Sequence, residues 1–251
     1  MATAVARASV STNVERRLPG RRYDHVFFTG MALLILATVF VGFAHTYYLA
    51  GVFRAPLPAP IIHVHGAAFT CWILLLVAQT SLVSTGRVDV HRRLGVAGFL
   101  LACVMVVLGV WAGTNSLGRA FGGGGDDPLF FYIIPVTDML IFATLIAFAF
   151  RERRDSAAHK RLIMIGTTAL MIAAVARWPF APVHFNPPVA TLFTYVFLVM
   201  LVAYDLWSMR RVHRATIWGS VFLIVVQWIR VPIGQSAAWH GFAAWVQAMA
   251  R

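Results

Sequence analysis

Seven long apolar runs dominate this sequence and restrict what it can fold into. Each is about 20 residues long, the length that a helix needs to cross a hydrocarbon core of about 30 Å. Only 12% of the 251 residues are charged, about half the fraction usual in a soluble domain. The pattern predicts an all-α fold, a bundle of seven transmembrane helices at approximately 26–49, 61–84, 93–113, 129–150, 161–180, 190–209 and 216–236.

The distribution of basic residues predicts the orientation of these helices. If the N-terminus lies inside, the inner segments carry most of the arginine and lysine, and the outer segments carry only Arg54, Arg119 and Arg251. Positive charge accumulates in short cytoplasmic loops, so we expect the N-terminus inside and the C-terminus outside. The net charge of +12 then matches anionic lipid headgroups at the inner face, and nucleic acid is not expected as a partner.

Composition divides the chain into three parts. Residues 1–24 are polar and basic and lack the apolar core of a signal peptide, so we expect a cytoplasmic tail and a first span that is retained as an anchor. Residues 25–236 are the predicted membrane domain, and 237–251 a short tail on the outer side. Cys71 and Cys103 fall mid-span, where free cysteine usually behaves as a small core residue.

Three spans begin with a similar pattern, which indicates an internal repeat. The third, fifth and seventh are entered through "HRRLG" (91–95), "HKRLI" (159–163) and "HRATI" (213–217). The last two of these spans end similarly, in "ARWP" (176–179) and "IRVP" (229–232). Repeats of this kind are common in membrane bundles. The pattern favours three helical hairpins behind one extra N-terminal helix.

The histidines at these helix starts have two interpretations. His91, His159 and His213, with His25 before the first span, would form a ring on the inner side, suited to a proton relay or a metal. Alternatively, they are interfacial residues at helix starts that an upstream acid caps. Asp24, Asp89 and Asp155 occupy such positions. Repetition by itself explains the set, so we favour the second interpretation.

Three histidines at the outer ends of spans are candidates for a cofactor site. His45 lies near the end of the first span, and His63 and His65 lie in "IIHVH" at the start of the second. If the helix began only at Gly66, both imidazoles of the second span would share one side. The three histidines could then hold a transition metal, or two of them could ligate haem b. Arg177 and Arg230 would suit the propionates; another anion or small-molecule site, or a structural role, stays open.

Asp138 is the deepest charged residue of the predicted bundle. It lies about ten residues into the fourth span, near the midplane. A carboxylate at that depth is costly unless it is paired, neutral or beside an internal cavity. Its expected partner is Arg177 or Arg230, and Gln227 lies one turn from Arg230 on the same face. This set forms either a working intramembrane site or a structural ion pair.

The quoted helix starts resemble those of uncharacterised bacterial polytopic membrane proteins whose helices begin with His-Arg/Lys-Arg-Leu. The matching segments are "VDVHRRLG" (88–95) and "AAHKRLIM" (157–164), and "HVHGAAFTCWILLLVAQTSL" (63–82) also looks like that group. The resemblance implies a location in the bacterial inner membrane. Some related-looking proteins are b-type cytochromes or assist oxidase assembly, but this sequence lacks histidine pairs deep in opposing spans.

Three classes of function therefore remain open. The first is a haem- or metal-binding redox component that uses the outer histidines, and the second is a small transporter or sensor built on Asp138, Arg177 and Arg230. The third is an accessory or assembly subunit with membrane-protein partners. We favour binding or redox over an enzyme with its own turnover.

Overall fold

The structure is a computed structural model that describes residues 23–56, 58–122 and 127–250, and no β-strand occurs within those ranges. The predicted tail, 1–24, therefore lies almost wholly outside the described residues. The elements are α1 (Asp24–Phe43), the π-helical turn η2 (Ala44–Tyr48), α2 (Ala50–Phe53), α3 (Pro60–Ser84), α4 (Val88–Gly118), α5 (Pro128–Phe131), α6 (Ile133–Arg151), α7 (Ser156–Ala169), α8 (Met171–Val175), α9 (Pro187–Met209), α10 (Arg214–Gly234) and α11 (Ala237–Ala250).

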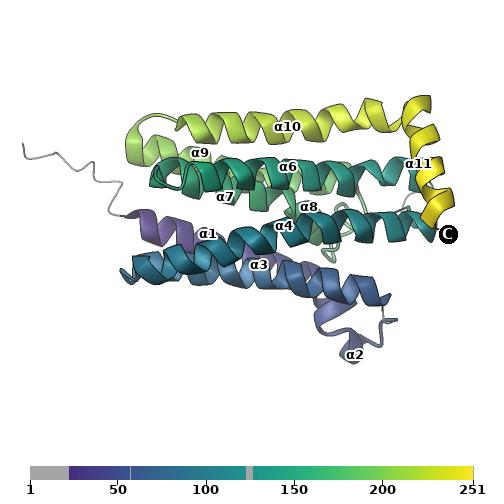
Figure 1. The fold of residues 1–251 in the computed structure, drawn as a ribbon, viewed down its shortest axis with the longest axis horizontal. Helices are drawn as coiled ribbons and strands as arrows, with labels where there is room; N and C mark the ends of the chain where they lie inside the picture. Colours follow the sequence, from purple (N-terminus) through teal and green to yellow (C-terminus); the bar gives the residue numbers. More distant parts are fainter. Residues whose placement is uncertain (1–22, 57, 123–126, 251) are drawn as a thin grey trace, which may run out of the picture.

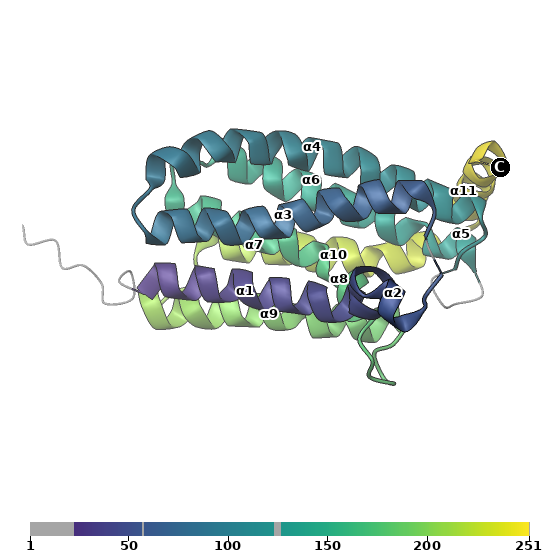
Figure 2. The same ribbon diagram turned by 90° about the horizontal axis from the view of Figure 1, so that it is seen from below.

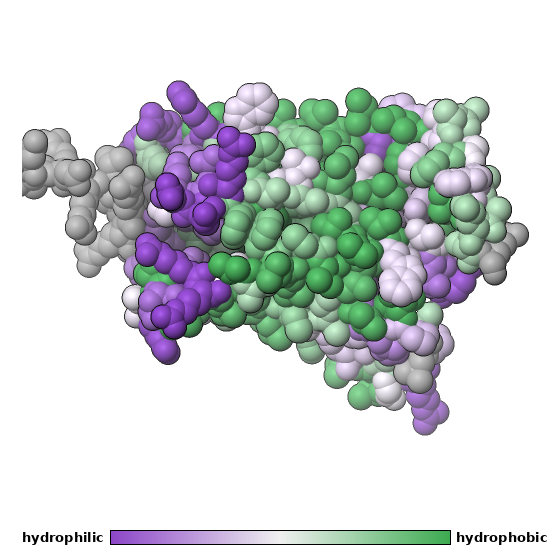
Figure 3. Space-filling view, in the orientation of Figure 1, coloured by the Kyte–Doolittle hydropathy of each residue, from purple (hydrophilic) through white to green (hydrophobic). Residues whose placement is uncertain are grey.

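The long helices lie side by side and give an elongated bundle (Figures 1 and 2). One end, called here the basic end, carries the turns at 85–87, 152–155 and 210–213. Figure 3 shows hydrophilic side chains gathered at that end and a broad hydrophobic surface over the middle of the bundle. α11 lies across the opposite end, where it packs on α4 and α5. Residues 237–250, expected as a tail, thus form a helix.

Six segments are long and apolar enough to cross a membrane, which confirms the all-helical, multi-pass character predicted from the sequence. They are 24–48, 60–84, 88–118, 128–151, 187–209 and 214–234. The expected fifth span is the exception, because it is two shorter helices, α7 and α8, instead of one continuous helix. Cys71 and Cys103 were expected in the core, but both are exposed on the outer surface of the bundle.

The break between α7 and α8 follows from consecutive threonines. The Thr167 and Thr168 hydroxyls donate to the carbonyls of Ile163 and Met164, at 2.8 and 2.9 Å. Such bonds to the preceding turn compete with the backbone ladder and bend helices. The Leu170 N–H then bonds to the Thr167 carbonyl at 3.0 Å, one residue short of the α-helical partner. The chain nevertheless continues toward the end opposite the basic end (Figure 2).

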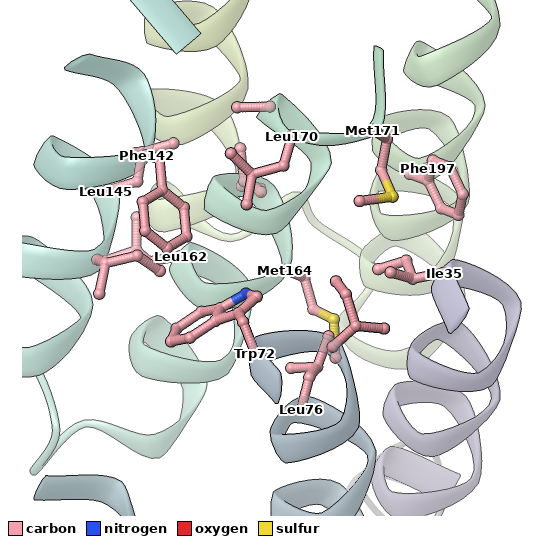
Figure 4. Packing of buried hydrophobic residues seen from close by; sticks show 14 of the residues in the cluster. Ile35, Trp72, Leu76, Phe142, Leu145, Leu162, Met164, Leu170, Met171 and Phe197 are labelled. Atoms are coloured by element: carbon pink, nitrogen blue, oxygen red, sulfur yellow. The ribbon is translucent and has the colours of Figure 1, made fainter. Parts of the chain in front are cut away.

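α7 and α8 form the centre of the bundle, and the main hydrophobic core surrounds them (Figure 4). The Trp72 indole stacks edge-on against Phe142, with ring centres 5.1 Å apart, and donates to the Thr167 hydroxyl at 3.1 Å. Gly42 lets α1 approach α8 so closely that a Cβ would overlap the Ala174 backbone. The core therefore joins α1, α3, α6 and α7.

Candidate functional site

A cavity of about 1080 Å³ opens at the basic end between α1, α3, α4, α6 and α7. Its volume lies at the upper limit of ordinary ligand pockets. The deep part is apolar, and the side chains there include Trp72, Leu76, Ile146 and Met164, all buried. A ligand that fills this part must present an apolar body.

The shallow part of the same cavity is cationic. The basic and imidazole side chains that line it are His25, His91, Arg92, Arg153, Arg154, His159 and Lys160. Asp24 is the one acidic residue among the described lining residues, and it pairs with Lys160 at 2.5 Å and accepts from the Tyr204 hydroxyl. Among the described residues, none of the three lining arginines forms an ion pair. The mouth thus has a net positive charge.

Helical periodicity places these side chains along one face. His91, Gly95 and Gly98 on α4 are four and three residues apart, the spacing of neighbours on a helix face, and all three line the cavity. On α7, Asp155 caps the helix by accepting from two backbone N–H groups, at 2.9 and 3.1 Å. That cap confirms the expected role of Asp155 and fixes the position of His159, one turn further on.

His91 and His159 are the two imidazoles that approach each other across this cavity. Their ring centres are 6.4 Å apart and the ring planes are nearly perpendicular, at 86°. The Nδ1 atom of His159 lies 2.7 Å from the Ala149 carbonyl. Because that nitrogen is fixed by the backbone of α6, the Nε2 atom of His159 is left for another partner.

His213, the fourth histidine of the predicted inner ring, is structural. It does not line the cavity; it caps α10, and its Nδ1 accepts from the Ala215 N–H at 3.1 Å. Burial, followed by the nearby Arg161, lowers the pKa of His213, which favours the neutral form that can accept this bond. The structure therefore gives this histidine a role as a helix cap.

Sequence reasoning missed Asp205, which forms the most deeply buried ion pair of the described chain. Its Oδ1 accepts from the Nε and Nη2 of Arg161, at 2.9 and 2.5 Å. Its Oδ2 accepts from the Thr216 hydroxyl and the His213 N–H, at 2.5 and 2.9 Å. Arg161 is 1% exposed and Asp205 is 0% exposed. The carboxylate in the apolar stretch "VAYDLW" (202–207) was the available signal.

The outer histidines do not form the predicted ligand set. α3 begins at Pro60, so His63 and His65 lie on one continuous helix and point about 200° apart, at about 100° per residue. His45 stacks on Phe53 and His65 packs on Phe69, with ring centres 4.2 and 4.0 Å apart. In the described part of the chain, no group of three histidine, cysteine or acidic side chains is arranged to hold a metal. This geometry does not support the three-histidine site.

The two predicted propionate partners lie apart. The guanidinium carbon of Arg177 lies 4.9 Å from the centre of the Phe43 ring, and its Nη1 donates to the Ala173 carbonyl. Arg230 instead donates to Asp138 at 2.7 Å, which is one of the two pairings that the sequence suggested. Both members of this pair are buried, so Arg230 is committed to a carboxylate of the chain itself.

The Asp138–Arg230 pair borders a second, smaller cavity of about 450 Å³ at the end opposite the basic end. Aromatic side chains and prolines, such as Phe130, Pro188 and Trp228, form part of its wall, and Arg230 and Gln227 reach it from α10. Gln227 is 3% exposed and its amide lies beside the Asp138 carboxylate, but neither of its polar atoms completes a hydrogen bond of ordinary geometry within the described ranges. An unpaired buried amide is costly, so this position is suited to a polar group of a ligand.

An exposed ion pair lies at the mouth of the second cavity. The Nε2 of His240 on α11 is 2.8 Å from Asp127, which also caps α5. This hydrogen bond raises the pKa of His240. Burial acts to raise the pKa of Asp127, but hydrogen bonds from His240 and from the Phe130 and Leu129 N–H groups outweigh it and hold the pKa below its ordinary value.

No family model, curated protein or solved structure matches this chain at a significant level. Six long apolar helices around a broken central helix define a multi-pass integral membrane protein. Within that class, the two cavities are the features that bear on function.

Proposed function

We propose that the protein crosses the membrane seven times, with its basic end in the cytoplasm, and binds an amphipathic anion in the basic-end cavity. The segment from Ser156 to Val175 supports the seventh crossing, because it is about 30 Å long at 1.5 Å per residue. The positive charge at one end supports the orientation. The resemblance of the helix starts to bacterial membrane proteins supports a place in the bacterial inner membrane.

The observation that carries the proposed function is the division of one cavity into an apolar depth and a cationic mouth. The buried side chains of Trp72, Leu76 and Met164 exclude a fully hydrated ion from the deep part. Arg92, Arg153 and Arg154 at the mouth favour a carboxylate or a phosphate, to which guanidinium groups bind with two hydrogen bonds. A molecule with an apolar body and an acidic group satisfies both parts.

The cavity gives arginines of the basic end a role in ligand binding, in addition to setting the orientation of the chain in the membrane. Arginines that serve the positive-inside rule alone need only face the lipid headgroups. Arg92, Arg153 and Arg154 instead surround one opening, whereas Arg87, Arg151 and Arg211 are exposed at the same end and do not line it. The two sets of arginines carry equal charge, but only the first lines the cavity. Replacing each set in turn therefore separates binding in the cavity from attraction by the overall charge.

Binding of 11-(dansylamino)undecanoic acid, measured by fluorescence in nanodiscs of neutral phosphatidylcholine, tests this proposal. We expect saturable binding by the wild-type chain. Replacing Arg92, Arg153 and Arg154 with Gln should weaken it about tenfold, because each exposed ion pair is worth up to about 1 kcal/mol. The same replacement at Arg87, Arg151 and Arg211 should change it less than twofold. Equal losses in the two triple variants would contradict a defined site.

The second cavity favours a second candidate, a transport or sensing role based on the intramembrane Asp138–Arg230 pair. This candidate rests on the buried amide of Gln227, which lies beside the ion pair at the wall of the cavity. This candidate expects a pH-dependent change in tryptophan fluorescence that Asp138→Asn abolishes and that the exposed Asp89→Asn leaves intact. Identical pH profiles in both variants and the wild type would exclude it.

A further inference from the structure

We propose that the amphipathic anion of the basic-end cavity is a haem, and that His91 and His159 ligate its iron from opposite faces. This inference rests on the proposed function of the same cavity and names its ligand class. The site uses two histidines of the inner ring, on α4 and α7, for which the sequence favoured the interfacial interpretation, in place of the outer histidines that were suggested as haem ligands.

The separation of the two rings is the first argument. A bond between a metal and an imidazole nitrogen is about 2.0 Å long, and the centre of a five-membered ring with bonds of about 1.33 Å lies about 1.1 Å from each ring atom. Two imidazoles on opposite sides of one iron therefore have centres about 6.2 Å apart. The observed separation of 6.4 Å agrees with that value. The same separation and the perpendicular planes also lie within the range of edge-to-face aromatic pairs, about 4.5–7 Å, so the distance permits ligation of one iron and the surroundings of the rings distinguish the two arrangements.

The surroundings of His159 are the second argument. Histidines that bind metals usually use their other ring nitrogen to donate to a carbonyl or a carboxylate, which fixes the ring and its tautomer. The Nδ1 of His159 has such a partner in the Ala149 carbonyl, at 2.7 Å. The Nδ1 of His91 is buried and has no hydrogen-bond partner within the described residues. The backbone of α6 thus fixes the His159 ring, and the His91 ring keeps an unpaired nitrogen, which is costly unless a ligand uses it.

The room around the rings is the third argument. α4 packs mainly on α3 and α6, and α7 packs mainly on α6 and α10, so the two histidine-bearing helices flank the cavity. Gly95, one turn from His91, has no side chain to fill the space beside the ring, and a Cβ there would meet only the Gln79 amide, at 3.6 Å. An apolar macrocycle between the rings would contact Ile163 and Met164, which line the cavity four and five residues further along α7 than His159.

The charge at the mouth is the fourth argument. A haem carries two propionates, and guanidinium groups pair with carboxylates through two parallel hydrogen bonds. Arg92, Arg153 and Arg154 line the cavity and form no ion pair within the described ranges. The basic-end cavity thus combines two imidazoles, an apolar space and three guanidinium groups. These are the groups that bind haem in helical bundles.

Absorption spectroscopy of the purified full chain with added haemin, before and after dithionite, tests the inference. We expect one haem per chain with a low-spin, six-coordinate spectrum in both oxidation states. His91→Gly and His159→Gly should each remove that spectrum, and added imidazole should restore it, which shows that the variants fold. The outer variants His45→Ala and His63→Ala should keep the wild-type spectrum.

Parallel titration with the dansyl acid separates the two proposals. If haemin displaces the dansyl acid but its spectrum is unchanged in His91→Gly and His159→Gly, the cavity binds amphipathic anions and the histidine ligation is wrong. If haemin fails to bind while the dansyl acid binds saturably, the haem inference fails and the proposed function stands. If neither binds, both proposals fail. Loss of the haem spectrum in His45→Ala or His63→Ala alone would return the site to the outer histidines.

Discussion

Replacing Asp205 with Asn should destabilise the bundle more than any exposed acidic substitution. In the wild type both carboxylate oxygens are used, one by Arg161 and the other by Thr216 and the His213 N–H. An asparagine keeps one oxygen and places an NH₂ group against either the guanidinium or the other two donors. The charge of Arg161, which is 1% exposed, then loses its counter-ion.

Breaking a buried ion pair from one side costs about 3–5 kcal/mol. For a chain of this size each kcal/mol lowers the Tm by about 2–4 °C, so we expect D205N to lower the Tm by about 10 °C. Thermal unfolding in one detergent, followed by circular dichroism, measures this. The control is Asp89→Asn, at an exposed position in the first turn of α4, which should stay within about 0.5 kcal/mol of the wild type.

A double variant tests whether charge pairing is the cause. Arg161→Met should cost about as much as D205N, because it leaves the carboxylate uncompensated. Arg161→Met combined with Asp205→Leu removes both charges, and we expect it to recover part of the lost stability, since apolar replacements of buried pairs are often neutral. A D205N variant as stable as the control, or a double variant worse than both single variants, would refute the reasoning.

Two further predictions follow from local geometry. Gly42→Ala should cost about 1–3 kcal/mol, because the new methyl group would overlap the Ala174 backbone, whereas Gly30→Ala on the same helix has open space and should be neutral or slightly stabilising in the same thermal assay. The His240–Asp127 contact should be strongest between about pH 4 and 6.5. Because the pKa of His240 is raised, the stabilisation from its protonated imidazole is fully present below pH 6.5, the ordinary pKa of histidine. That stabilisation is lost as the pH rises through the higher pKa of the folded state. Because the pKa of Asp127 is lowered, the stabilisation from its carboxylate is fully present above pH 3.8, the ordinary pKa of aspartate. That stabilisation is lost as the pH falls through the lower pKa of the folded state. Hydrogen exchange of α11, corrected for intrinsic rates, should show greatest protection in that window, and Asp127→Asn should flatten the profile.

The sequence predicted the helices well because crossing a membrane requires long apolar runs, and such runs are visible in the composition alone. It did not predict the break at Leu170, because Thr167 and Thr168 are compatible with an unbroken helix until their hydroxyls are seen to bond to the preceding turn. The pairing of Asp138 with Arg230 was one of two suggested options. A carboxylate near the midplane needs a nearby cationic partner, so the sequence could suggest this ion pair.

The location of the candidate site was harder to predict. "IIHVH" drew attention because two histidines stand close together in the sequence, but α3 starts at Pro60 and turns them apart. The repeated helix starts did place His91 and His159 in one inner ring, for which a metal role was the less favoured interpretation. Helix rotation depends on packing, so the sequence could not show which two members of the ring face each other; the packing of α4 and α7 against α6 brings these two rings together.

Mapping the site of photo-crosslinking by a diazirine-bearing fatty acid tests the central claim most directly. The chain is held in neutral nanodiscs, irradiated with sub-stoichiometric probe, digested and analysed by mass spectrometry. The account predicts adducts on cavity residues such as Trp72, Leu76 and Met164, and their loss when excess oleate is added but not when its methyl ester is added. Adducts spread over exposed positions of α4 such as Leu100, Val104 and Val107, with no effect of competitor, would contradict it.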